Sequence, residues 1–354
     1  MNKRNNYQNI HFKTSIQNLE NNLKLSVFGQ DHAIKEISSR IIIREAGLGD
    51  VHKPIASFLF TGPTGVGKTE LAIELAKNLN LHFERFDMSE YSSDHSMSTL
   101  IGAASGLKGY DEGGVLTNAI KKNPHCVLLL DEIEKADKTI LNTFLQILDY
   151  GVLTNSKGEK VDFSHVIIIM TSNLGATAKS SMGFGSNSKT NSDDEVNEFL
   201  SPEFRARIEC KIEFNPLTKE MVQAITDKFL KQLSDKLYTQ HKMMIVTTKA
   251  MEEIINRAFD SKLGARYISK IINDTIKQKL AHELLFGRFK QSDRVTIDFQ
   301  DDFEYIFKNY EQVGSFSNDE IFFKTAQEAQ LYAKANPDII IVRSNHSDGF
   351  IVKK

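Results

Sequence analysis

Residues 62–69 have the types and spacing of a phosphate-binding loop. The segment consists of Gly62, Pro63, Thr64, Gly65, Val66, Gly67, Lys68 and Thr69, and it matches the pattern G-x-x-x-x-G-K-[ST]. The glycines let backbone N–H groups turn toward the β- and γ-phosphates of a nucleotide, and the positive end of the following helix adds to this attraction. Lys68 supplies a positive charge to the phosphates, and the hydroxyl group of Thr69 can bind Mg²⁺. Because the segment lies between an apolar strand and an amphipathic helix, we interpret it as a nucleotide site.

Two carboxylates follow about sixty residues later. Asp131 ends the apolar run Val127–Asp131, and Glu132 comes directly after it. A carboxylate at the end of a neighbouring parallel strand can reach a nucleotide-bound Mg²⁺, directly or through water. A second carboxylate beside it can act as general base on the attacking water, which favours hydrolysis over transfer to an organic acceptor. An acidic strand end alone could equally be a helix cap; the phosphate loop favours the catalytic interpretation.

Asn173 follows the apolar run Val166–Thr171. Its side-chain amide could lie between the two strands that carry the phosphate loop and the carboxylates, and hold the lytic water there. Taken alone the signal is weak, because Ser-Asn after a strand is usually a turn.

These residues need a sheet that brings strand ends together. Five short segments have the composition of strands: Ser57–Thr61, Phe83–Asp87, Val127–Asp131, Val166–Thr171 and Lys211–Phe214. Three of the five are almost continuously apolar, as is typical of a parallel sheet covered on both faces. Leucines recur every four positions in Thr69–Asn80 and give that segment one apolar helical face. The alternation predicts a three-layer α/β domain with a parallel five-stranded sheet.

The character of the chain changes after Asn215-Pro216, which predicts further domains. Apolar spacings indicate three helices, marked by Val222–Leu237, Met251–Ala258 and Ile268–Leu280, and then a strand at Val295–Phe299. The last residues predict a strand, a helix that begins at Thr325, and two more strands. We therefore expect a flexible segment at 1–22, a large α/β domain at 23–215, a small, mostly helical domain at 216–300, and a C-terminal βαββ appendage of unknown role at 301–354.

The composition excludes several other classes of protein. The 354 residues include 44 Lys+Arg and 46 Asp+Glu, so a formal net charge of -2 gives no general attraction to nucleic acid or anionic lipid. No apolar run approaches the roughly 20 residues of a membrane span. Two cysteines cannot form a disulfide framework, and Met1–Lys13 lacks the apolar core of a secretory signal. We expect a cytoplasmic protein that binds neither nucleic acid nor membrane.

Taken in order, these elements resemble the AAA+ ATPases, and within them the Clp unfoldase family, most of all the second ATPase module of ClpA-type chaperones. The resemblance covers roughly residues 25–300, and it implies that 23–215 is a large AAA+ ATPase domain and 216–300 its small, mostly helical lid domain. It is carried by the phosphate loop, the strand end Leu128–Lys135 and further segments at Val27–Asp31, His52–Pro54, Phe86–Tyr91, Pro202–Arg207, Gly264–Arg266 and Glu283–Gly287.

The resemblance implies roles that the spacing alone does not. Val27 and Phe28 would contact the adenine, and Asn173 would sense the γ-phosphate. Arg266 would be a second sensor, and Arg207 an arginine finger that enters the site of a neighbouring subunit. Such a finger stabilises charge on the transferred phosphoryl group. A finger in trans requires a ring, and the ring of this family is a homo-hexamer that uses ATP and Mg²⁺.

The resemblance also implies loops that act on protein substrates. Leu107 and Lys108 align with a pore loop in which an aromatic residue is expected, and His95 lies in the secondary pore loop. Met182, Gly183 and Phe184 align with a loop that docks on a ClpP-type peptidase in unfoldases that feed proteolysis.

Three functions remain open at this point. The first is a protein unfoldase that threads polypeptides through its pore into a ClpP-type peptidase. The second is a nucleotide-gated scaffold or loading factor that does not thread, which leucine at 107 in place of an aromatic residue favours. The third is a nucleic-acid motor or clamp loader, against which the near-neutral charge and the lack of a basic stripe count.

Overall fold

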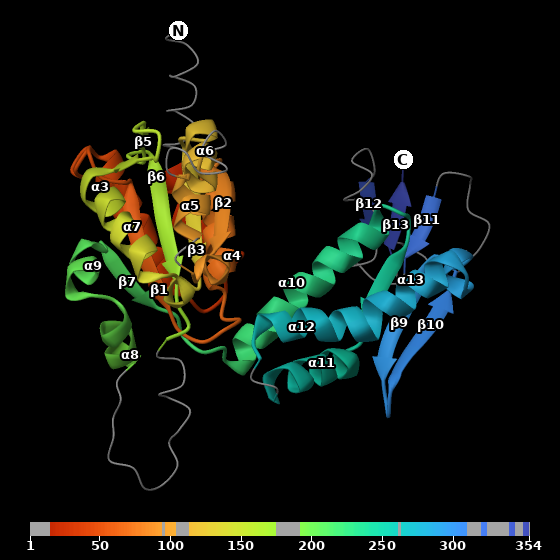
Figure 1. Cartoon of the computed structure of the whole chain (residues 1–354). Coiled ribbons are helices and arrows are strands. Elements are labelled where there is room, and N and C mark those ends of the chain that lie inside the picture. Colours follow the sequence, from red (N-terminus) through yellow and green to blue (C-terminus); the bar gives the residue numbers. More distant parts are fainter. Residues whose placement is uncertain are drawn as a thin grey trace, which may run out of the picture. The chain divides into compact units, whose positions relative to one another are not determined.

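The computed structural model describes residues 15–93, 96–103, 113–174, 192–260, 263–309, 320–323, 340–343 and 350–353. These residues form two compact units (Figure 1). The first contains the described residues up to Phe229 together with Ile254–Ile272, and the second contains Leu230–Glu253 and the described residues from Asn273 onward. The domain limits expected from the sequence, at 215 and 300, stay predictions.

A parallel five-stranded sheet forms the centre of the first unit. Its order is β2-β3-β6-β1-β7, and every neighbouring pair is parallel. The strands are β1 Ala56–Thr61, β2 His82–Asp87, β3 Cys126–Asp131, β6 Val166–Thr171 and β7 Cys210–Glu213. Each lies within one residue of the limits that the apolar runs predict. β1, β3 and β6 are buried along their whole length, as expected for strands covered on both faces.

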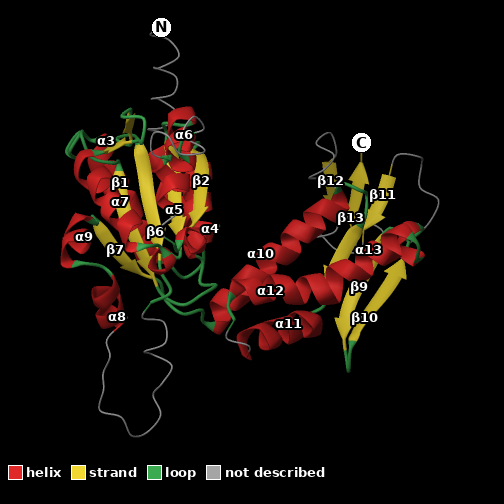
Figure 2. Cartoon of the chain, in the orientation of Figure 1, coloured by secondary structure: helices red, strands yellow, loops and turns green. Residues whose placement is uncertain are grey.

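Helices cover both faces of this sheet, which confirms the three-layer prediction (Figure 2). Alternate residues of each strand point to opposite faces. Phe58, Phe60 and Leu129 belong to the core cluster that contains α2 Leu19–Lys24, α3 Asp31–Glu45 and α4 Lys68–Leu79. Leu59, Leu128 and Leu130 belong to the opposite cluster, formed with α5 Ser96–Ile101, α6 Val115–Lys122, α7 Lys138–Tyr150, α8 Ser192–Phe199 and α9 Pro202–Arg207. The unit is completed by the short hairpin of β4 Val152–Thr154 and β5 Lys160–Asp162, and by the 3₁₀ turns η1 Met88–Tyr91 and η3 Ile133–Lys135.

The first helix corrects one expectation about the amino terminus. The predicted flexible segment, 1–22, overlaps α2, in which Leu19 and Leu23 have no exposed surface. Both leucines pack in the core cluster of α3 and α4. Asn and Gln are frequent in residues 1–22, so the composition does not reveal that Ile16 and Leu19 are buried.

The second unit contains a three-stranded sheet of order β10-β9-β8. Its strands are β8 Met243–Val246, β9 Arg294–Phe299 and β10 Phe303–Lys308, and only β9 is predicted from the sequence. The helices are α10 Lys219–Tyr238 and α11 Thr248–Asp260, which contribute residues to both units, and α13 Gln278–Leu285 with the turn η5 Arg288–Lys290.

The third predicted helix, marked by Ile268–Leu280, is not a single α-helix. It is divided into α12 Ala265–Ile272, a π-helical turn at η4 Asn273–Lys277, and α13. An i, i+4 apolar spacing does not distinguish these cases, because both keep one buried face.

The carboxyl-terminal residues include a second small sheet, of order β11-β13-β12, with antiparallel neighbours. The strands are β11 Glu320–Phe323, β12 Ile340–Arg343 and β13 Phe350–Lys353, close to the predicted ones. The helix predicted to begin at Thr325 lies outside the described residues.

Candidate functional site

The phosphate loop connects the end of β1 to the start of α4, as its position in the sequence predicts. Gly65 shows why this loop requires glycine. Its φ is +78°, and a Cβ atom there would lie 2.9 Å from the carbonyl oxygen of Leu263. The backbone N–H of Ala265 donates to the Gly65 carbonyl at 2.9 Å. Any other residue would therefore suffer both an unfavourable backbone conformation and a steric clash.

The Lys68 side chain is buried at the start of α4, with 7% of the residue exposed. Its Nζ donates to the Pro63 carbonyl at 3.0 Å, to the Gly62 carbonyl, and to Asn173 Oδ1 at 2.9 Å. Burial lowers the pKa of Lys68 to about 8, although Glu134 and Asp131 oppose this shift. The ammonium group thus lies inside its own loop, where a negatively charged ligand would favour its charged form.

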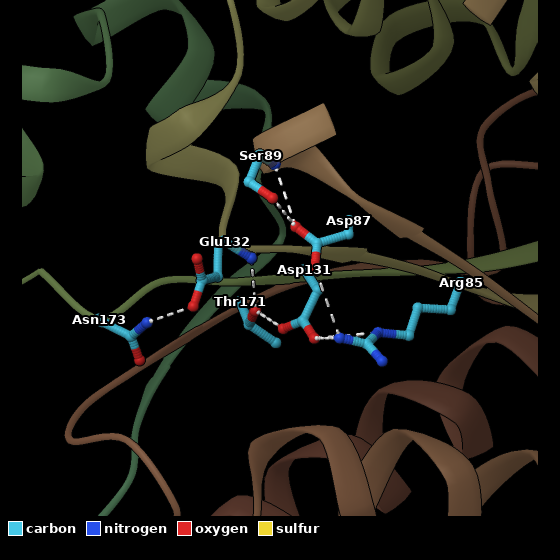
Figure 3. Close-up of polar contacts among 7 residues, drawn as sticks. All are labelled: Arg85, Asp87, Ser89, Asp131, Glu132, Thr171 and Asn173. Atoms are coloured by element: carbon cyan, nitrogen blue, oxygen red, sulfur yellow. Dashed lines mark hydrogen bonds and ion pairs between the residues drawn. The ribbon is translucent and has the colours of Figure 1, made fainter. Parts of the chain in front are cut away.

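Asp131 lies at the end of β3, with both carboxylate oxygens engaged (Figure 3). Oδ1 accepts from the Thr171 hydroxyl of β6, and Oδ2 forms an ion pair with Arg85 Nη2 of β2 at 2.7 Å. Arg85 also lies 3.8 Å from Asp87, whose pKa is lowered mainly by the hydrogen bond from Ser89. A carboxylate has about four acceptor positions, so Asp131 keeps capacity for a further ligand.

Glu132 adopts an unusual backbone conformation directly after β3. Its φ and ψ are both 55°, in the left-handed region that costs a non-glycine residue about 1–2 kcal/mol. The backbone N–H of Glu132 donates to Thr171 Oγ1 at 3.0 Å, which fixes this turn to the neighbouring strand. The strained turn places the two carboxylates of Asp131 and Glu132 on either side of Thr171, as Figure 3 shows.

Asn173 connects the lysine to the second carboxylate. Its Oδ1 accepts from Lys68, and its Nδ2 donates to Glu132 Oε1 at 3.2 Å. Its backbone N–H donates to Glu134 Oε1 at 3.0 Å. Because β6 lies between β1 and β3 in the sheet, Asn173 lies between the phosphate loop and the carboxylates.

A cavity of about 290 Å³ joins these groups. Of the predicted site residues it is lined by Val27, Phe28, Thr64, Gly65, Val66, Gly67, Lys68, Thr69, Asp131, Glu132, Asn173 and Arg266. Gly62 and Pro63 do not line it, but their carbonyl groups contact Lys68. All of these residues belong to the first compact unit.

Arg207 is the predicted catalytic residue that this cavity does not contain. It lines a separate cavity, together with Arg40, Asp149 and Glu209. Of the two arginines predicted to act on the nucleotide, Arg266 therefore lines the cavity with Lys68 and Glu132, whereas Arg207 lines another.

The sequence interpretation missed several residues of the site. Ile73, Ile225 and Phe229 line the apolar part of the cavity, and Lys228 donates to the Ser26 carbonyl at 3.0 Å and to Glu70 at 2.7 Å. Arg85, the partner of Asp131, was also missed. Arg85 lies near Asp131 because β2 pairs with β3 in a register that places Asp87 opposite Asp131. This register depends on tertiary pairing and cannot be read from the spacing of residues along the chain.

The buried side-chain amide of Gln30, which the sequence interpretation also missed, contacts the backbone of the phosphate loop. Gln30 has no exposed surface, and its Nε2 donates to the Asn215 carbonyl at 2.9 Å and to the Val66 carbonyl at 3.4 Å. Its Oε1 accepts from the backbone N–H of Asn215 at 3.0 Å. Gln30 thus connects the loop to the end of β7.

The predicted substrate-contacting residues His95, Leu107 and Lys108 lie outside the described residues, as do Met182, Gly183 and Phe184. Among the residues that are described, no three His, Cys, Asp or Glu side chains are grouped so as to bind a metal ion on their own. In the same part of the chain, no helix has the length and apolar character needed to cross a membrane.

Two family descriptions match the chain. The "AAA domain (Cdc48 subfamily)" matches residues 53–211, and the "C-terminal, D2-small domain, of ClpB protein" matches residues 217–297. The two matches are adjacent and in this order.

Curated relatives are similar over most of this chain. A "ClpA homolog protein" of Fuscovulum blasticum is 45% identical over 291 residues, which are 81% of this chain and 37% of the relative. A "Chaperone protein ClpB" of Clostridium tetani is 40% identical over 295 residues, 81% of this chain and 34% of the relative. The chain thus spans about a third of the length of these relatives.

A solved structure has the same fold. It is a closed-state cryo-EM reconstruction of Hsp104 with ATPγS and FITC-casein, 34% identical in sequence, and it aligns with a TM-score of 0.74. The alignment covers 83% of this chain and 52% of that one.

Proposed function

Because this chain belongs to the Clp-type AAA+ ATPases, we propose that it hydrolyses ATP in a homo-hexameric ring and uses the energy to unfold protein substrates. The observation that carries the proposal is the single cavity in which Lys68, Glu132 and Asn173 are joined by hydrogen bonds while Arg207 lies elsewhere. Such a site contains the groups for binding and for general-base catalysis, and it needs a second subunit for the finger.

The residues present fit a triphosphate. The ammonium of Lys68 is buried among carbonyl oxygens, and its pKa is already lowered, so phosphate oxygens would replace those carbonyls as better partners. Val27, Phe28, Ile225 and Phe229 also line the cavity and supply apolar surface for the adenine of the nucleotide. Glu132 would take a proton from water, and the Asn173 amide would hold its carboxylate in place.

The oxygen atoms of Thr69 and Asp131 fit Mg²⁺, which prefers one or two protein oxygens together with the phosphates of the substrate. Bound Mg²⁺ would neutralise charge on the phosphate oxygens. Thr171 and Arg85 hold the Asp131 carboxylate in a fixed orientation for this role.

The test is an ATPase assay with Mg²⁺ combined with sizing of the assembly. We expect ATP-dependent hexamers whose hydrolysis rate rises when FITC-casein, the polypeptide present with the similar Hsp104 structure, is added. The cytoplasmic location predicted from the composition is part of this proposal. Hexamers whose ATPase rate does not respond to unfolded protein would contradict the unfoldase assignment.

The alternative, a scaffold that does not thread its partner, is favoured by Leu107 in the predicted pore loop. Leucine offers less contact area to a polypeptide than an aromatic side chain. If the chain threads, Leu107→Ala should abolish most of the stimulation by FITC-casein, measured as the ratio of stimulated to basal ATPase rates. Lys77→Ala, in the exposed last turn of α4, is the control that should keep the ratio. An unchanged ratio in Leu107→Ala would favour the scaffold.

Delivery to a ClpP-type peptidase is a further proposal, which rests on Met182–Phe184 alone. A Met and a Phe within a segment of otherwise polar sequence have the character of an anchor for apolar pockets. Deleting the three residues should leave the ATPase rate within about twofold and prevent degradation of a tagged folded protein in the presence of the peptidase. Undiminished degradation by the deletion variant would refute the docking assignment, and no degradation by the intact chain would remove the peptidase from the proposal.

A further inference from the structure

Two acidic residues of its own chain hold the Arg207 guanidinium. Arg207 ends α9, and its Nε donates to Asp149 Oδ2 from the last turn of α7. Its Nη1 donates to the Glu203 carbonyl at 2.8 Å, and its Nη2 lies 3.2 Å from Glu203 Oε1. The two carboxylates therefore contact opposite ends of the same group.

The difference between these ends matters for phosphate binding. An arginine commonly binds a phosphate through two parallel N–H groups. In Arg207 the outer pair, Nη1 and Nη2, is covered by Glu203, whereas Asp149 occupies Nε only. Arg207 could thus leave Glu203 and bind phosphate while Asp149 keeps its hold.

Exposure indicates which contact is released more easily. The Glu203 side chain is 64% exposed and lies four residues from Arg207 on one short helix. Exposed ion pairs of this kind contribute little to stability, because water screens the charges and holding two long side chains costs entropy. The Asp149 side chain is only 26% exposed and comes from a different helix, one that is packed in the core. The cavity of about 320 Å³ beside Arg207 provides room for an incoming group.

Helix stability does not explain an acidic residue at position 149. A carboxylate in the last turn of a helix faces the negative end of the helix dipole, which is unfavourable. The last turn of α7 contains no basic residue to offset this cost. The ion pair with Arg207 is a contact that does account for an acidic residue at position 149.

We propose that Asp149 is the positioning residue of the arginine finger: it keeps hold of Arg207 Nε while Nη1 and Nη2 exchange Glu203 for the phosphate bound by a neighbouring subunit. This inference rests on the proposed function, because it takes Arg207 to act in trans. It predicts that removing the charge of Asp149 and removing the charge of Glu203 have different effects on ATP hydrolysis, although both carboxylates contact Arg207.

The experiment compares Asp149→Asn with Glu203→Gln in the full chain, with ATP and Mg²⁺. Loss of orientation should lower kcat at least about tenfold in Asp149→Asn and leave KM within about twofold, since displacing a catalytic group by about 1 Å can cost up to about a hundredfold in rate. Glu203→Gln should change kcat by less than about twofold. Glu209→Gln is the matched control: Glu209 lines the same cavity and faces Arg40 at 3.9 Å, and this variant should match the parent chain.

Arg207→Ala separates positioning from a merely structural role. If Asp149 acts through Arg207, Asp149→Asn should cause no further loss in an Arg207→Ala background; a further tenfold loss there would overturn the proposal. Should Asp149→Asn fail to assemble, Asp149→Glu keeps the charge and should retain a rate well above that of Arg207→Ala; a rate as low as Arg207→Ala would contradict the proposal.

The same variants show which claim fails. A normal rate of ATP hydrolysis in Arg207→Ala would refute the proposed role of Arg207 as an arginine finger. A strong loss in Arg207→Ala together with a normal rate in Asp149→Asn would refute only the role of Asp149.

Discussion

Lys68→Ala should abolish nucleotide binding. The variant removes an ammonium group that donates two hydrogen bonds to carbonyl groups of the phosphate loop and one to Asn173, and that lines the cavity. Hydrogen bonds to charged groups contribute about 1.5–3 kcal/mol each. Loss of two such bonds to phosphate therefore predicts an affinity for ATP lower by at least about a hundredfold. Titration of a fluorescent ATP analogue at constant Mg²⁺ measures this change.

Lys77→Ala is the control for this measurement. Lys77 lies in the last turn of the same helix, its side chain is 64% exposed, and it pairs with Glu74. The control should keep the affinity of the parent chain. A Lys68→Ala variant that binds ATP normally would show that residues 62–69 are not the phosphate site.

Glu132→Gln should bind ATP and assemble but fail to turn over. Glutamine can still accept the hydrogen bond from Asn173 Nδ2, and it is no less suited to the left-handed backbone at this position. It cannot take a proton from water, and a positioned general base contributes about 10²–10⁴-fold. We expect kcat to fall by that factor while ATP affinity stays within about threefold.

Single-turnover hydrolysis and equilibrium binding separate these two effects. Glu74→Gln, on the α4 helix and not among the residues that line the cavity, is the control that should hydrolyse ATP at the parent rate. Normal turnover in Glu132→Gln would remove this residue from the role of base.

The centre of the sheet could be predicted from sequence because three of its five strands are almost continuous apolar runs. β1, β3 and β6 are buried on both faces, so local composition carries their whole signal. The phosphate loop and the two carboxylates could be predicted for a similar reason, since their chemistry depends on short spacings at strand ends.

What could not be predicted depends on tertiary contacts. β8 is a four-residue run that becomes a strand by pairing with β9. Arg85 reaches Asp131 because β2 pairs with β3 in one register. The strain at Glu132 follows from its hydrogen bond to Thr171 on the adjacent strand. No spacing along the chain encodes these relations.

A mixture of two inactive variants tests most directly whether each ATP site is shared between subunits. Glu132→Gln keeps its finger but lacks its base, and Arg207→Ala keeps its base but lacks its finger. When the two are mixed as free subunits before ATP and Mg²⁺ are added, a site formed from the base of one and the finger of the other should hydrolyse ATP, so the rate should exceed that of either variant alone. A mixture no faster than its components, or Arg207→Ala subunits that hydrolyse ATP at the parent rate without a partner, would contradict the account.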